Sequence, residues 1–143
     1  MTPVRSTPGK ALVFAALLFT LSGCLWLRYE RMVTTHSELL SVYAGDAAAI
    51  VAAGLTPDDS YLRSLEYPLL RARDFSGKAR ARLAARPSMD SLDLLIATYG
   101  RLYDLMVPLR KAPPTPEMAA EIAILGVRAG QENLAVEQAL LAE

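Results

Sequence analysis

Apolar residues recur at alternating spacings of three and four along most of the chain, which is the pattern of amphipathic α-helices. The first run keeps a heptad seam for about four heptads: Trp26, Tyr29, Val33, His36, Leu40, Tyr43, Ala47, Ile50 and Gly54. This run predicts a helix over residues 26–53, about 40 Å long at 1.5 Å per residue. We expect Gly54 to end it in the left-handed backbone conformation that glycine tolerates.

The segment Thr56-Pro57-Asp58-Asp59 predicts the start of a second helix. Thr56 can cap the helix, Pro57 suits the first turn, and the two aspartates favour the positive end of the helix dipole. The expected apolar face consists of Tyr61, Leu62, Leu65, Leu69 and Leu70. Because proline removes a helical hydrogen bond, we expect the helix at 57–85 to be broken around Pro68 or around Ser76-Gly77.

The third helix, expected at 89–110 with Ser88 or Asp90 as its cap, has the clearest amphipathic pattern in the chain. Its seam is Leu92, Leu95, Tyr99, Leu102, Met106 and Leu109. The segment Thr115-Pro116-Glu117 predicts the start of a fourth helix at 116–141. That helix carries Met118, Ile122, Leu125, Ala129, Asn133, Val136 and Leu140.

Gly126 and Gly130 stand four residues apart within the expected fourth helix. This spacing is consistent with close packing of the helix against a neighbour. It is also consistent with a local weakening of the helix near Gly130, because glycine is a poor helix former.

Four amphipathic helices with short connections predict an all-α fold, an up-down-up-down four-helix bundle. No segment alternates between apolar and polar residues as a half-buried strand would. The short connections leave no room for a second folded domain, so residues 24–143 are expected to form a single bundle domain.

The N-terminus has the features of a secretory signal peptide. Arg5 and Lys10 precede the apolar stretch 11–20, which leads into Leu21-Ser22-Gly23-Cys24. This ending resembles the lipobox of bacterial lipoproteins. The resemblance implies that a diacylglycerol is attached to the Cys24 thiol, that residues 1–23 are cleaved off, and that the new amino terminus is acylated.

The resemblance also implies a location in the bacterial cell envelope. In lipoproteins of two-membrane bacteria, an aspartate after the cysteine favours the inner membrane. Leu25 occupies that position here, which favours the outer membrane, with the domain facing the periplasm. The alternative is an uncleaved membrane anchor over residues 11–27, followed directly by Arg28 and Arg31.

Removal of residues 1–23 leaves 120 residues, with thirteen basic and fifteen acidic side chains and a formal charge of −2. A near-neutral exported domain is a poor binder of nucleic acid. Cys24 is the only cysteine, so its lipidation leaves no thiol for a disulfide, a metal site or a nucleophile.

His36 is the only histidine, and it lies on the first seam. One histidine without the Glu-x-x-His pairs of di-iron bundles, and without a Cys-x-x-Cys-His motif, predicts neither a metal nor a haem cofactor. We expect His36 to be structural and hydrogen-bonded at the edge of the core. The alternative is an amphipathic ligand pocket formed by His36, Tyr43, Tyr99 and Tyr103. Otherwise these tyrosines lie at the core rim with their hydroxyls at the surface.

Charge is segregated along the mature chain. The segment 71–86 carries six basic residues against Asp74 alone: Arg71, Arg73, Lys78, Arg80, Arg82 and Arg86. Residues 112–143 carry five glutamates and only Arg128. The basic segment either contacts an anionic surface, such as lipid headgroups or an acidic partner, or is balanced by acidic residues of a neighbouring helix.

The sequence contains no Gly-x-Ser-x-Gly turn, no phosphate-binding loop and no dinucleotide fingerprint. It therefore favours a membrane-anchored, non-enzymatic interaction or accessory lipoprotein of the cell envelope, with a protein partner there. The alternative function is an envelope binding or sensor domain that holds a small apolar or aromatic ligand within the bundle.

Overall fold

The computed structural model describes the backbone of residues 8–143 and the side chains of residues 25–143. The expected cleavage and lipidation at Cys24 concern a side chain outside this description. The described part contains four α-helices, α1 (Pro8–Ala52), α2 (Asp59–Arg80), α3 (Pro87–Met106) and α4 (Pro116–Ala142). A short 3-10 helix, η1 (Val107–Arg110), follows α3 directly, and residues 8–143 contain no strand. The predicted all-α class is confirmed.

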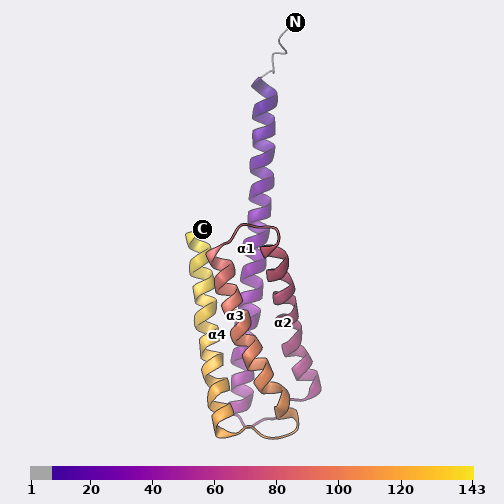
Figure 1. The fold of residues 1–143 in the computed structure, drawn as a ribbon, viewed down its shortest axis with the longest axis vertical. Helices are drawn as coiled ribbons and strands as arrows, with labels where there is room; N and C mark the ends of the chain where they lie inside the picture. The colour runs from indigo at the N-terminus through magenta and orange to yellow at the C-terminus, as the bar shows by residue number, and fades with distance from the viewer. Residues whose placement is uncertain (1–7) are drawn as a thin grey trace. The chain divides into compact units, whose positions relative to one another are not determined.

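The chain divides into two compact units, one ending at Met32 and the other spanning Val33–Glu143. The second unit contains the end of α1 with the whole of α2, α3 and α4. Successive helices in this unit run in opposite directions, as the colour gradient of Figure 1 shows. The unit is therefore the predicted up-down-up-down four-helix bundle. Among the described residues, no helix is both long and apolar enough to cross a membrane.

Each helix of the bundle contacts the next, and the last contacts the first. Between α1 and α2, the rings of His36 and Phe75 lie 5.0 Å apart. Between α2 and α3, the Tyr99 hydroxyl donates a hydrogen bond of 2.8 Å to the Leu65 carbonyl. Arg101 on α3 pairs with Glu121 on α4, with 2.9 Å between nitrogen and oxygen.

Helix α4 packs against α1 at Gly126. A Cβ atom there would lie 2.8 Å from the Ala48 Cβ and 3.3 Å from the Ala44 carbonyl oxygen, both on α1. A Cβ at Gly130 would have nothing within 4 Å. The expected close packing therefore occurs at Gly126 and not at Gly130, and α4 continues without a break through both glycines.

The core follows the predicted seams closely on two of the helices. All six seam residues of α3, Leu92 to Leu109, are buried, and on α4 Ile122, Leu125, Ala129 and Val136 are buried. From Val33 onward, every second seam position of α1 is as predicted, at Val33, Leu40 and Ala47, and the positions between them lie one residue later than predicted. Its fully or nearly fully buried positions are Val33, Ser37, Leu40, Ala44, Ala47 and Val51, with His36 buried beside them. The predicted seam residues Tyr43 and Ile50 are only half-buried.

Helix α2 is continuous, so the predicted break around Pro68 or Ser76-Gly77 is wrong. Pro68 and Ser76 face the core, where contacts with neighbouring helices hold the backbone helical. Pro68 lacks the amide that would donate to the Ser64 carbonyl, which lies one residue before the Leu65 carbonyl that accepts the Tyr99 hydroxyl. The helix ends at Arg80 instead of residue 85, and Leu70 is exposed instead of belonging to the apolar face.

Two helix ends were predicted correctly. Gly54 has φ of 70° and ends α1, where its amide donates to the Val51 carbonyl and the Leu55 amide donates to the Ile50 carbonyl. Thr115 caps α4 by accepting a hydrogen bond from the Met118 amide.

Two other predicted caps are wrong. Asp58, and not Thr56, caps α2, because its carboxylate accepts the Tyr61 amide at 2.7 Å. Neither Ser88 nor Asp90 caps α3. Instead the Ser88 amide donates to the Glu143 carboxylate, at 2.8 Å, which the end of α4 supplies to the positive end of α3.

Candidate functional site

Three helices bring four tyrosines together inside the bundle. Tyr43 on α1, Tyr61 on α2 and Tyr103 on α3 lie close enough to Tyr99 on α3 that each contributes to raising its pKa. Burial, followed by the nearby Asp46 and Tyr43, raises the pKa of Tyr61 to about 12. Burial is also the main cause that raises the pKa of Tyr99. Tyr61 and Tyr99 are therefore neutral near pH 7.

The tyrosine cluster fills space in the core. Tyr99 is fully buried, and its hydroxyl is used in the hydrogen bond to the Leu65 carbonyl. The Tyr61 hydroxyl is buried without a hydrogen-bond partner among the described residues. Tyr43 and Tyr103 are half-buried, as expected for residues at the core rim.

His36 lies apart from the tyrosine cluster. It precedes Tyr43 by seven residues, about 10 Å along the helix axis. Its ring packs against Phe75, and its Nε2 atom is buried without a hydrogen-bond partner among the described residues. Burial, followed by the positive charge of Arg71, lowers the pKa of His36. The structure thus brings together Tyr43, Tyr99 and Tyr103 of the predicted ligand set, but not His36.

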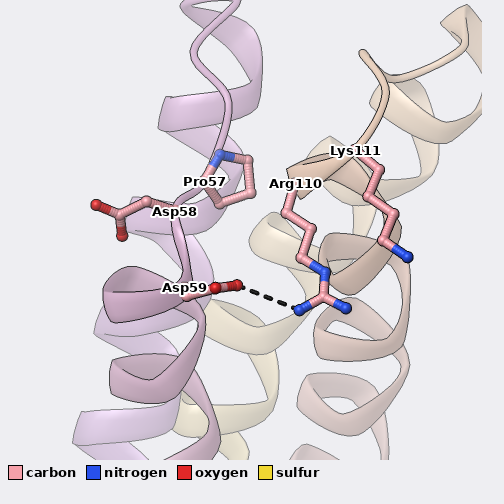
Figure 2. A pocket seen from close by; sticks show the side chains of 5 residues that line it. All are labelled: Pro57, Asp58, Asp59, Arg110 and Lys111. Atoms are coloured by element: carbon pink, nitrogen blue, oxygen red, sulfur yellow. Dashed lines mark hydrogen bonds and ion pairs between the residues drawn. The ribbon is translucent and has the colours of Figure 1, made fainter.

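No group of three or more histidine, cysteine, aspartate or glutamate side chains lies together in a metal-binding arrangement among the described residues. A surface hollow of about 430 Å³ does collect opposite charges, where the start of α2 meets the end of η1. Figure 2 shows Asp59 pointing toward Arg110, with 3.2 Å between oxygen and nitrogen, while Asp58 points away. Because Asp58 caps α2 and Asp59 pairs with Arg110, both carboxylates have structural partners.

Three of the six cations in the basic segment are neutralised by nearby carboxylates. Lys78 pairs with Asp74 on the same helix, at 2.7 Å. Arg80 bridges to α3, with 2.6 Å between its guanidinium and Asp90, and it also pairs with Asp93. Arg86 lies 3.6 Å from the Glu143 carboxylate. The balancing acids therefore come mainly from α2 and α3, and only Glu143 belongs to the acidic C-terminal part.

The other three cations, Arg71, Arg73 and Arg82, form no ion pair with any carboxylate in the described part of the chain. The Arg71 guanidinium lies 6.0 Å from the centre of the Tyr67 ring. The Arg73 side chain reaches across to α3, where its Nη2 atom would lie 2.8 Å from a Cβ at Gly100. Two residues along a helix are separated by about 200°. Arg71 and Arg73 therefore lie on opposite edges of α2 and do not form one basic patch.

The outward face of α4 carries a second row of heptad-spaced residues, opposite the row that packs into the core. We call it the outer stripe of α4, and it consists of Ala120, Ile124, Val127, Gln131, Leu134, Gln138 and Leu141. All seven residues are exposed, and their spacing alternates strictly between four and three. The four large aliphatic side chains are 57–87% exposed: Ile124, Val127, Leu134 and Leu141.

A shallow surface hollow of about 430 Å³ lies on this face, lined by Ala123, Ile124, Val127, Arg128 and Gln131. Isolated exposed aliphatic residues are common on proteins, but a continuous row at heptad spacing is typical of a helix that packs on another helix. This stripe was not predicted from the sequence, although its heptad spacing is present there. Residues 118–141 carry apolar residues on two faces, and only the inward row was assigned.

The chain matches no known protein-family profile, no curated protein sequence and no solved structure. Its function must therefore be inferred from the features above.

Proposed function

We propose that this protein is a non-enzymatic interaction protein of the bacterial cell envelope. A lipid on Cys24 holds it at a membrane, and the outer stripe of α4 binds an amphipathic helix of a partner. The observation that supports this function is the outer stripe itself, in which four large aliphatic side chains are exposed on one helix face at heptad spacing. A row with alternating spacings of three and four is complementary to a second helix with the same spacing.

The packing of the bundle favours this function over a ligand-binding one. A pocket would require free space beside the candidate tyrosines, but Tyr99 is fully buried and its hydroxyl already has a partner. The two surface hollows described above lie on the outside of the bundle and not among its tyrosines.

The membrane part of the proposal is supported by the resemblance of Leu21-Ser22-Gly23-Cys24 to the lipobox. A lipid anchor confines the bundle to a thin layer and raises the effective concentration of any partner held at the same membrane. A moderate apolar surface is then sufficient for specific association. Leu25 favours the outer membrane as this location.

Site-specific photocrosslinking in membranes of bacteria that produce the full chain tests the proposal. A photoreactive residue is placed at Val127, in the outer stripe, or at the matched control position Leu94, an aliphatic residue on α3 that is 58% exposed. We expect discrete crosslinked protein adducts from position 127 and none from position 94. No adduct from position 127, or the same adducts from both positions, would contradict the proposed function.

The contribution of the anchor is tested in the same cells. We expect Cys24→Ser to release the chain from the membrane fraction, or to block its processing, and to reduce the adducts at position 127. Full membrane retention and unchanged processing of this variant would contradict the proposed anchor, but not the interaction surface.

A further inference from the structure

The following inference rests on the proposed function and identifies the partner. We propose that the helix bound by the outer stripe of α4 is α4 of a second copy of this chain. The two helices lie parallel and in register about a twofold axis.

The residue types along the stripe suit such a pair. In heptad terms, the positions spaced by seven residues at Ala120, Val127, Leu134 and Leu141 are d positions. The a positions are Ile124, Gln131 and Gln138. In a parallel, in-register pair, each residue faces its own counterpart, so aliphatic residues meet aliphatic residues. Ile124 at an a position, with Leu134 and Leu141 at d positions, is the combination that favours two-stranded coils.

The two glutamines favour a second copy over an unrelated helix. Against an apolar partner surface, each side-chain amide would lose its hydrogen bonds to water without replacement, which is unfavourable. In the parallel pair, Gln131 faces Gln131 of the second copy, and each amide can donate to and accept from the other. Gln138 does the same one heptad later. A polar pair at an a position is a known means of fixing the register of two helices.

The flanks of the stripe allow close approach without like charges meeting. In a parallel pair, a g position faces the e position five residues later on the other helix. This places Ala123 opposite Arg128 and Gly130 opposite Ala135. A Cβ at Gly130 would have nothing within 4 Å, so there is open space for a second helix.

The size of the stripe indicates a weak pair that depends on the membrane. From Ala120 to Leu141 it is about 32 Å long, and a helix with its side chains is about 10–12 Å wide. The contact is therefore at the small end of specific protein interfaces. A parallel twofold pair also places the Val33 ends of both bundles at the same end, as two chains anchored in one membrane require. Confinement to that membrane compensates for the modest contact area.

Disulfide crosslinking of the full chain in membranes tests the pair and its direction. Ala120→Cys and Leu134→Cys are made one at a time, with Leu94→Cys as the exposed control. The unaltered chain measures any covalent dimer that forms through Cys24 alone. After mild oxidation, we expect covalent dimers from Ala120→Cys and from Leu134→Cys, well above the yield from Leu94→Cys. Position 120 is decisive for direction, since in an antiparallel pair its two copies lie far apart.

A charge substitution in the stripe then tests specificity. In the Ala120→Cys chain, Leu134→Glu is expected to lower the dimer yield at least about tenfold, while Leu94→Glu leaves it unchanged. Both side chains are exposed, so neither change affects the core, and unchanged far-UV circular dichroism verifies this. Equal effects of the two substitutions would contradict a role of the stripe in the pair.

The remaining outcomes separate this inference from the proposed function. If position 120 gives no dimer while Val127 crosslinks to other proteins, the second copy is the wrong partner and the proposed function stands. If Ala120→Cys joins only to Gln138→Cys in mixed samples, the pair is antiparallel and the inferred direction is wrong. If neither crosslinking experiment gives any adduct, both the inference and the proposed function are wrong.

Discussion

Two glycines on one helix predict opposite responses to the same substitution. Gly126 and Gly130 both lie inside α4, so alanine at either position improves helix propensity by about 0.8–1 kcal/mol. The surroundings of the two positions differ. At Gly130 the new methyl group enters open space, and at Gly126 it lies 2.8 Å from the Ala48 Cβ. We therefore expect Gly130→Ala to stabilise the bundle and Gly126→Ala to destabilise it.

The expected magnitudes follow from these contacts. The obstructing atoms at Gly126 are a short side chain and the Ala44 carbonyl, so α1 and α4 must move apart to relieve the overlap. Overpacking of this kind costs about 1–3 kcal/mol. After the gain in propensity, Gly126→Ala is expected to lose up to about 2 kcal/mol, and Gly130→Ala to gain up to about 1 kcal/mol. The difference between the two variants isolates the steric term, since the propensity gain is common to both.

Urea unfolding followed by far-UV circular dichroism measures both variants against the unaltered chain. The free energies of unfolding are compared at a common slope, so that a change in the midpoint reports stability. If Gly126→Ala stabilises the bundle as much as Gly130→Ala does, then α4 does not pack closely on α1. In that case the order of the four helices around the core would need revision.

Further expectations concern the core, the histidine and the anchor. Leu102→Ala should lower the free energy of unfolding by about 2–5 kcal/mol, because Leu102 is fully buried on α3, and a loss below about 0.5 kcal/mol would contradict its place in the core. The pKa of His36 is lowered in the folded state, so the unfolded chain binds the proton more readily. Stability should therefore fall as pH decreases below about 6.5, and His36→Leu should remove that part of the pH dependence in urea unfolding, whereas an unchanged pH profile would contradict it. Intact mass of the membrane-extracted protein should show a lipid-modified chain that begins at Cys24, and an unmodified thiol with Met1–Gly23 attached would exclude the lipobox interpretation.

Sequence periodicity was sufficient where one face of a helix holds large apolar residues and the other does not. On α3, Leu92 follows Ser91 and precedes Asp93, and Leu102 follows Arg101, and both leucines are buried. On α1 the contrast is weaker, because alanines lie on several faces. Ala44 and the larger Tyr43 both fit a heptad, and the closeness of α4 at Gly126 leaves room only for the smaller side chain.

Local rules failed where distant residues provide the missing interaction. Pro68 removes one hydrogen bond from α2, the one that the Ser64 carbonyl would accept, but α2 stays continuous because its buried face packs on the other helices. Similarly, α3 begins without a capping side chain of its own, because Glu143 supplies the acceptor from α4. In both cases the support comes from residues outside the segment, so it could not be read from that segment alone.

Prediction of the candidate surfaces from the sequence was limited in the same way. The sequence shows six cations in residues 71–86. Whether they form a basic patch depends on which edge of α2 each side chain occupies and on which acids face it. The heptad row of the outer stripe was readable along α4. Its exposure was not readable, since an apolar row that widens the buried face gives the same spacing.

Thiol accessibility in the membrane tests most directly whether the outer stripe of α4 is an interaction surface. Val127→Cys and Leu134→Cys, with Leu94→Cys as the exposed control, are labelled with a water-soluble maleimide in membranes and again after solubilisation and dilution in detergent. We expect the two stripe positions to react several-fold more slowly than position 94 in membranes, and at similar rates after dilution, because a bound helix covers the stripe only in the membrane. Equal labelling rates at all three positions in intact membranes would show an uncovered stripe and would contradict the proposed interaction surface.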